Sequence, residues 1–207
     1  MISFSKTLLK AWIATIKRNK MKNFIKFTLA ATLAAIFLGG CLAKQAKPYT
    51  YYELRYDQKR CVNPSGTRKN IFIDTITATD LVDRRDILIV DFRNRTRFAS
   101  DAKFITMPSE MVYKALLDAA FSTCSLNPIF VPKERDLRLK TSIVALQVNN
   151  DQATVTMGYE ILNSLESIKS GIVTKRVFVP DPSSQSIYNA LNLALNESIN
   201  EILKALR

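Results

Sequence analysis

The sequence predicts a single small α+β domain in which a mainly antiparallel sheet is covered by two helices. Apolar residues recur at helical spacing in two segments, at about residues 108–122 and 182–206. Elsewhere between residues 49 and 179 most apolar residues alternate with polar ones, and short turns separate these runs. Because short turns join antiparallel neighbours, we expect one mainly antiparallel sheet that the two helices cover.

The part of this domain before the first helix is expected to hold four short strands. They are predicted at residues 49–56, 70–77, 86–92 and 96–100, the last one extending a little further. Residues 79–85 form a connector between the second and third strands. Arg93, Asn94 and Arg95 are predicted to form the turn of a hairpin.

The helix at residues 108–122 begins at Pro108, which suits a first helical turn, and Glu110 complements the positive end of the helix dipole.

Asn127 and Pro128 are expected to break the chain before a short strand at residues 129–131. Three longer strands follow at residues 137–148, 153–161 and 168–179 as an antiparallel meander. The alternation slips near the middle of the first, which indicates a β-bulge.

The last helix is predicted to begin with Asp181 as its cap and Pro182 at its first position. Its apolar stripe consists of Ile187, Leu191, Leu195, Ile199, Ile202 and Leu206. We expect this stripe to pack against the sheet, and a helix that binds a partner is the alternative.

The first 40 residues have the layout of a secretory signal. A lysine-dotted start is followed by an apolar run at residues 27–38 and then by Gly39, Gly40 and Cys41. The apolar run is shorter than the ~20 residues that a spanning helix needs, so a short transmembrane anchor is the less favoured alternative. Translation starts at Met1 or Met21, and Met21 gives a signal of ordinary length.

This stretch resembles a bacterial lipoprotein signal. The resemblance implies cleavage between Gly40 and Cys41, and attachment of diacylglycerol and an N-acyl chain to Cys41. Residues 41–48 would then be a lipidated tether and 49–207 a periplasmic α/β domain. The residue after the cysteine is Leu42 and not aspartate. By the sorting rule of enteric bacteria, this implies the outer membrane. The seven residues 42–48 reach at most about 23 Å, so the domain would stay close to the membrane.

Composition argues against several classes of function. The chain has a net charge of +12, but seven of its 30 basic residues and none of its 18 acidic residues precede Cys41. Removal of the signal therefore leaves 23 basic and 18 acidic residues, or +5, which weakens a nucleic-acid-binding function. There is no histidine, the usual general base and the commonest metal ligand. We therefore expect no enzymatic activity, no catalytic residue, no metal site and no cofactor other than the lipid on Cys41.

Two further cysteines, Cys61 and Cys124, lie within the predicted domain. In an oxidising periplasm, two cysteines in one folded domain are candidates for a disulfide. Two buried thiols are the alternative.

Basic residues of the domain gather in two groups. These are Arg84, Arg85, Arg93, Arg95 and Arg97, and Lys133, Arg135, Arg138 and Lys140. Arg93, Arg95 and Arg97 alternate, so in a strand they would share one face. That face would contact a protein partner or lipid headgroups. The alternative is a solvated hairpin with acidic residues nearby.

The chain from Cys41 onward resembles the ABC-type transport auxiliary lipoproteins, which include the lipoprotein partner of the paraquat-inducible MCE system. The resemblance lies in Tyr51-Tyr52-x-Leu54, in Ile76-x6-Asp83-Arg84 running into a strand, and in the order of helices and strands. The family often has a tryptophan just before the first helix. This chain has its only tryptophan at Trp12, and we expect Phe104 to fill that place.

The resemblance implies a non-enzymatic accessory of an MCE-type ABC system that moves phospholipid through the Gram-negative envelope. Its expected partners are the membrane, an MCE-domain protein and the permease and ATPase of the transporter. A pilot or structural lipoprotein of another assembly or secretion apparatus is the alternative. A homo-oligomer is compatible with the sequence, and we expect no large enclosed lipid pocket.

Overall fold

The computed structural model describes residues 48–58, 61–62 and 66–206. Residues Lys47–Arg207 form one compact unit. The predicted signal, its cleavage site at Gly40 and the lipidation site Cys41 lie outside the described residues. None of the helices in the described ranges is both long and apolar enough to cross a membrane.

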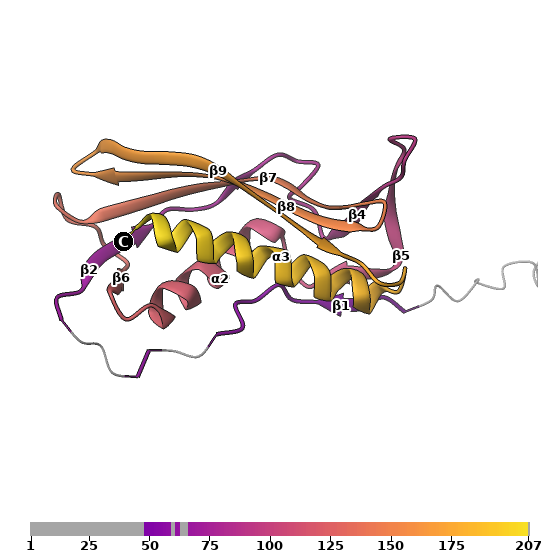
Figure 1. The fold of residues 1–207 in the computed structure, drawn as a ribbon, viewed down its shortest axis with the longest axis horizontal. Coiled ribbons are helices and arrows are strands. Elements are labelled where there is room, and N and C mark those ends of the chain that lie inside the picture. Colours follow the sequence, from indigo (N-terminus) through magenta and orange to yellow (C-terminus); the bar gives the residue numbers. More distant parts are fainter. Residues whose placement is uncertain (1–47, 59–60, 63–65, 207) are drawn as a thin grey trace, which may run out of the picture. The chain divides into compact units, whose positions relative to one another are not determined.

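The described chain forms nine strands and two helices, so the predicted α+β class is confirmed (Figure 1). The strands before the first helix are β1 (Thr50–Tyr52), β2 (Lys69–Ile73), β3 (Thr77–Ala78), β4 (Asp86–Val90) and β5 (Thr96–Phe104). The remaining elements are α2 (Pro108–Ser122), β6 (Leu126–Ile129), β7 (Leu137–Asn149), β8 (Gln152–Asn163), β9 (Glu166–Phe178) and α3 (Ser184–Ala205).

Strand β7 is the centre of the sheet. One of its edges pairs antiparallel with β8, and β9 continues this meander. Its other edge pairs in turn with β2, β3 and β4, all parallel. At one end β6 extends β2, and at the other β5 and β1 extend β4. The sheet is therefore mixed: its long ladders are antiparallel, and each parallel pairing spans two to four residues.

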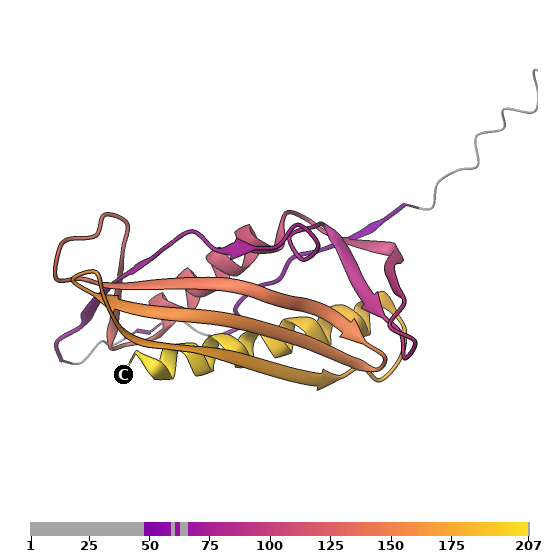
Figure 2. The same ribbon diagram turned by 90° about the horizontal axis from the view of Figure 1, so that it is seen from above.

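Helices α2 and α3 cover one face of the sheet, and α3 lies along β8 and β9 (Figures 1 and 2). The predicted bounds of α2 are confirmed. All six residues of the predicted α3 stripe are buried against the sheet. Strands β2, β4 and β5 add apolar side chains to the same core, and Phe104 of β5 is only 1% exposed. A chain that buries both an alternating sheet face and two helical stripes has a continuous apolar core.

The predicted cap of α3 is wrong. Ser183 caps the helix, and its Oγ accepts from the backbone N–H of Ser186 at 3.3 Å. Asp181 instead accepts from the N–H of Ser183 at 2.8 Å and from the Oγ of Ser186 at 2.6 Å. Its carboxylate thus closes a turn ahead of the helix, which begins two residues later than predicted.

Turns and bulges follow the sequence where local chemistry decides them. The register of β7 and β8 shifts between Ile143 and Ala145, so the predicted bulge is confirmed. Asn94 lies in the predicted hairpin turn and Asn150 in the turn between β7 and β8, with φ of 56° and 57°, a region that asparagine tolerates.

Three strand predictions need correction. The predicted strand at 49–56 ends at Tyr52, and the one at 70–77 is interrupted between Ile73 and Thr77. The predicted break at Asn127-Pro128 is wrong, because both residues lie within β6. Since β6 pairs with β2 alone among the described strands, it is an edge strand, where the missing N–H of a proline is tolerated.

Candidate functional site, a basic–aromatic face at one end of the domain

Exposed basic and aromatic side chains interleave on β1, β5 and the connector before β4. We call this surface the basic–aromatic face; it consists of Tyr49, Tyr51, Arg84, Arg85, Phe98 and Lys103. Three cations stack on three rings. Arg84 lies 5.1 Å from the centroid of Phe98, Arg85 5.3 Å from that of Tyr51, and Lys103 4.6 Å from that of Tyr49. At exposed sites each such contact contributes about 0.5–1 kcal/mol, enough to hold these flexible cations over the rings.

Strand periodicity places these residues. β1 runs parallel to β5, with Tyr51 beside Lys103 and Tyr52 beside Phe104. Successive side chains of a strand point to opposite faces. Phe104 therefore enters the core and Tyr52 stacks on Tyr188 of α3 at 4.8 Å, whereas Tyr51 and Lys103 face outward.

A single carboxylate organises the cations of this face. Asp86 accepts from Nζ of Lys103 at 3.0 Å and lies 3.9 Å from the guanidinium of Arg84. The hydrogen bond to Asp86 raises the pKa of Lys103 above its usual value. Arg85 donates from Nε to the carbonyl of Phe104 at 3.1 Å. Asp86 thus pairs with two of the three cations, and the face keeps an excess of positive charge.

The hairpin that joins β4 to β5 departs from the sequence prediction. Arg93 and Arg95 lie in its turn, and only Arg97 lies in a strand, so the three do not share one strand face. Asp91 is the reason: its Oδ1 accepts from the backbone N–H groups of Arg93 at 2.8 Å and Arg95 at 3.0 Å. These bonds, that of the Arg95 N–H foremost, lower the pKa of Asp91. Arg95 also forms an ion pair with Asp91 at 2.7 Å.

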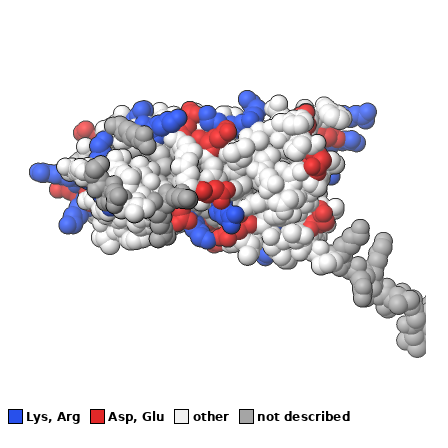
Figure 3. Space-filling model, turned by 60° about the horizontal axis from the view of Figure 1, so that its bottom comes forward, with Lys and Arg blue, Asp and Glu red and all other residues white. Residues whose placement is uncertain are grey.

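The tip of this hairpin is apolar as well as basic. Phe92 is 85% exposed between Asp91 and Arg93. Lys and Arg side chains project at the right-hand end of the domain in Figure 3, where Figure 1 places the hairpin, with acidic side chains beside them.

The second basic group lies elsewhere, and two of its members are neutralised by partners. Arg138 pairs with Asp74 at 3.0 Å, and Lys140 lies 4.0 Å from Glu160. These four residues line an open groove of about 850 Å³ on the outer face of the sheet. Because its two acids balance its two bases, this groove is less suited to anions than the basic–aromatic face. Among the described residues no cluster of three or more acidic or cysteine side chains is arranged to hold a metal ion.

The segment after β1 is fastened to α3 by a row of asparagines, which we call the asparagine ladder: Asn192, Asn196 and Asn200. The N–H of Arg55 donates to Oδ1 of Asn192 at 2.9 Å. Asn196 accepts from the N–H of Asp57 at 3.0 Å and donates to the carbonyl of Arg55 at 2.9 Å. The hydroxyl of Tyr56 donates to Asn200 at 2.7 Å.

These contacts explain why residues 53–58 form no strand: side chains of a helix satisfy their backbone groups. The ladder is absent from the sequence predictions. Its signal is the spacing of three asparagines by four residues, which places them on one face of a helix. The ladder fixes the chain directly after the segment that leads to the predicted lipid anchor.

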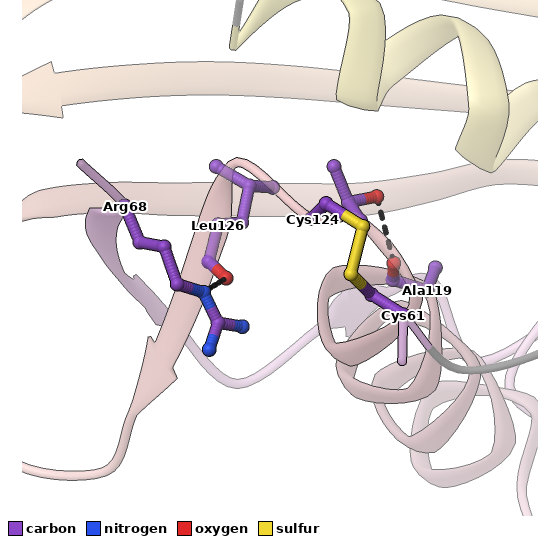
Figure 4. Close-up of a disulfide and its surroundings, with 6 residues drawn as sticks. Cys61, Arg68, Ala119, Cys124 and Leu126 are labelled. Carbon is purple, nitrogen blue, oxygen red and sulfur yellow. Dashed lines mark hydrogen bonds between the residues drawn. A yellow bond between two sulfur atoms is a disulfide. The ribbon is translucent and has the colours of Figure 1, made fainter. Parts of the chain in front are cut away.

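Cys61 and Cys124 form a disulfide with their Cα atoms 5.2 Å apart and 63 positions apart in sequence (Figure 4). The bridge attaches the loop after residue 58 to the end of α2. Next to it, Arg68 donates from Nε to the carbonyl of Leu126 at 2.8 Å, which connects the same loop to β6. The long connection from β1 to β2 is thus held at three points: the ladder, the disulfide and Arg68.

Comparison with known proteins shows where this fold occurs. No protein-family model matches the sequence, and no curated protein matches it either. An uncharacterised protein of known crystal structure superposes with a TM-score of 0.66 at 7% identity, covering 77% of this chain and 99% of its own. A Xanthomonas campestris protein of the family DUF330 also gives 0.66, at 12% identity, covering 74% of this chain and 92% of its own. At such low identity, the likeness shows that the chain shares the fold of these two proteins.

Proposed function

We propose that this protein is a lipid-anchored, non-enzymatic accessory of an MCE-type ABC system that transports phospholipid across the cell envelope. Cys41 would carry the lipid, with the outer membrane as its favoured location. An MCE-domain protein, or the permease and ATPase of the transporter, would be its partner. The basic–aromatic face would provide the surface that contacts this partner.

One observation supports this function most: the basic–aromatic face adjoins the point where the predicted tether enters the domain. Tyr49 and Tyr51 belong both to the start of the described chain and to this face. A protein held by a tether of about 23 Å keeps such a surface close to the membrane. The order of elements, which resembles that of the auxiliary lipoproteins, adds to this support.

The asparagine ladder fits the same function. It binds residues 55–57 to α3, so a force on the lipid anchor passes into the body of the domain. An accessory that braces a transport assembly against a membrane needs such a connection, whereas a free carrier does not.

Genetic epistasis tests the proposal. Outer-membrane integrity, measured as detergent sensitivity, would be compared in strains lacking this gene, an MCE-domain gene of the same organism, or both. We expect the double deletion to be no more sensitive than the more sensitive single deletion. Additive defects would contradict the proposal and favour a separate envelope assembly.

A further inference from the structure

We propose that the tip of the β4–β5 hairpin docks on the anionic lipid surface that carries the anchor, with Phe92 entering the headgroup region. This inference rests on the lipid anchoring in the proposed function, and it assigns the hairpin to the membrane and not to a protein partner.

The direction of the strands brings the hairpin tip and the tether to the same end of the domain. β1 and β5 are parallel, with Thr50 beside Ala102. Going backward from Thr50 toward the tether therefore follows β5 backward toward Thr96, where the hairpin turn begins. Figures 1 and 2 both show the hairpin at the end of the domain where the described chain starts.

The lengths also agree. Six residues separate Ala102 from Thr96, which at about 3.3 Å per residue places them at most about 20 Å apart. Residues 42–48 reach at most about 23 Å. The reach of the tether from the start of the domain is therefore at least as long as the distance from Ala102 to the hairpin. An anchored domain can place the hairpin tip on the membrane without further length.

The chemistry of the tip suits an anionic bilayer. Phe92 is an exposed aromatic ring with no apolar role in the fold. Arg93 follows it directly and Arg97 lies on β5 opposite Ile89, while Arg95 is folded onto Asp91. Apolar side chains that enter the headgroup region and basic residues attracted to anionic lipids are the two components of interfacial binding. The neighbouring loops at this end carry the acidic residues Asp151 and Asp181. Because an anionic lipid surface repels carboxylates, the contact is confined to the hairpin.

The sequence offers a direct probe of this contact. The only tryptophan is Trp12, so residues 42–207 contain none, and the chain has no histidine. Residues 42–207 are the mature chain of the proposed lipoprotein without Cys41, and they contain every described helix and strand. An N-terminal hexahistidine tag in place of Cys41 would tether this chain to vesicles that contain a nickel-chelating lipid. Phe92→Trp then reports on the tip alone.

The vesicles would contain phosphatidylethanolamine and phosphatidylglycerol with brominated acyl chains, which quench tryptophan. Phe130→Trp is the matched control: Phe130 is 65% exposed and follows β6, beside the N-terminal half of β7, whereas the hairpin lies beside its C-terminal end. We expect a blue-shifted, quenched emission for Phe92→Trp and a water-like, unquenched emission for Phe130→Trp.

Neutralising Arg93 and Arg97 to glutamine in the Phe92→Trp protein should lower the ratio of docked to undocked hairpin about 30-fold, at about 1 kcal/mol for each arginine. Equal emission of the two tryptophan variants would overturn the inference. So would a Phe92→Trp protein whose emission shifts to the blue only when an MCE-domain protein is added. Because the tag supplies the tether, either result leaves the lipidation of Cys41 and the epistasis test unaffected.

Discussion

Asn196→Ala should destabilise the domain by about 1.5 kcal/mol. Asn196 is buried, and its side chain serves the N–H of Asp57 at 3.0 Å and the carbonyl of Arg55 at 2.9 Å. Each of these hydrogen bonds contributes about 0.5–1.5 kcal/mol net. Alanine returns roughly 0.6 kcal/mol through its higher helix propensity, which leaves the stated loss.

The assay is urea unfolding of residues 42–207 with the disulfide intact, supported by thermal unfolding. For a domain of this size the expected loss lowers Tm by about 3–6 °C. Hydrogen exchange provides the site-specific measurement: the amide of Asp57 should exchange faster in the variant, because Asn196 is its acceptor, whereas the amide of Arg55 keeps its acceptor Asn192.

Asn189→Ala is the matched control. Asn189 lies on the exposed face of the same helix, where it accepts only from Gln185 at 2.9 Å. Its replacement should change the free energy of unfolding by less than about 0.5 kcal/mol. Equal stabilities for the two alanine variants, with unchanged exchange at Asp57, would refute the role assigned to the ladder.

Three further outcomes are expected. Replacing Cys61 and Cys124 by serine should cost about 4 kcal/mol by the chain-entropy estimate for a 63-residue separation, and alkylation of exported protein should find no free thiol at either position. The hydrogen bond from Asn70 lowers the pKa of Asp136, so its stabilisation is complete above the unfolded-state pKa and is lost as pH falls through the folded-state value; Asp136→Asn should flatten this acid limb of the unfolding profile. In an anchor-free protein of residues 42–207, Arg93→Glu with Arg97→Glu should weaken co-sedimentation with anionic phospholipid vesicles at low ionic strength, whereas Lys133→Glu with Arg135→Glu should not; Arg95 stays unchanged because its ion pair with Asp91 supports the turn.

Elements fixed by local chemistry are predictable from the sequence. Pro108 and an apolar stripe define α2, and Asn94 and Asn150 mark turns that need a positive φ. The meander is predictable because its strands are long and its turns are short. The disulfide partners can be named because only two cysteines follow Cys41.

Elements fixed by contacts between distant parts of the chain are not predictable from the sequence. β2, β3 and β4 each pair with a different stretch of β7, and strands of two to five residues carry too little pattern to reveal which one. The sequence predicts a chain break at Pro128 because it does not show that this residue lies on an edge strand. That edge position follows from the topology of the sheet. The alternation of Arg93, Arg95 and Arg97 suggests a strand, but Asp91 binds two of their backbone N–H groups and forms a turn.

The residues of the candidate site can be found in the sequence, but their arrangement cannot. The arginines and tyrosines appear in the composition, but their pairing does not, because the register of β1 on β5 decides which ring each cation meets. The asparagine spacing is visible too, but the residues that the ladder binds lie 135 to 144 positions away in the chain.

Identification of the proteins that co-purify with the mature lipoprotein from solubilised envelopes tests the account most directly. The bait would be the processed chain beginning at Cys41, and a Cys41→Ser protein that cannot be lipidated would be the control. The account predicts a fatty-acylated N-terminal peptide and enrichment of an MCE-domain protein together with the permease and ATPase. An unmodified Cys41, or enrichment of secretion or outer-membrane assembly components in place of the transporter, would contradict it.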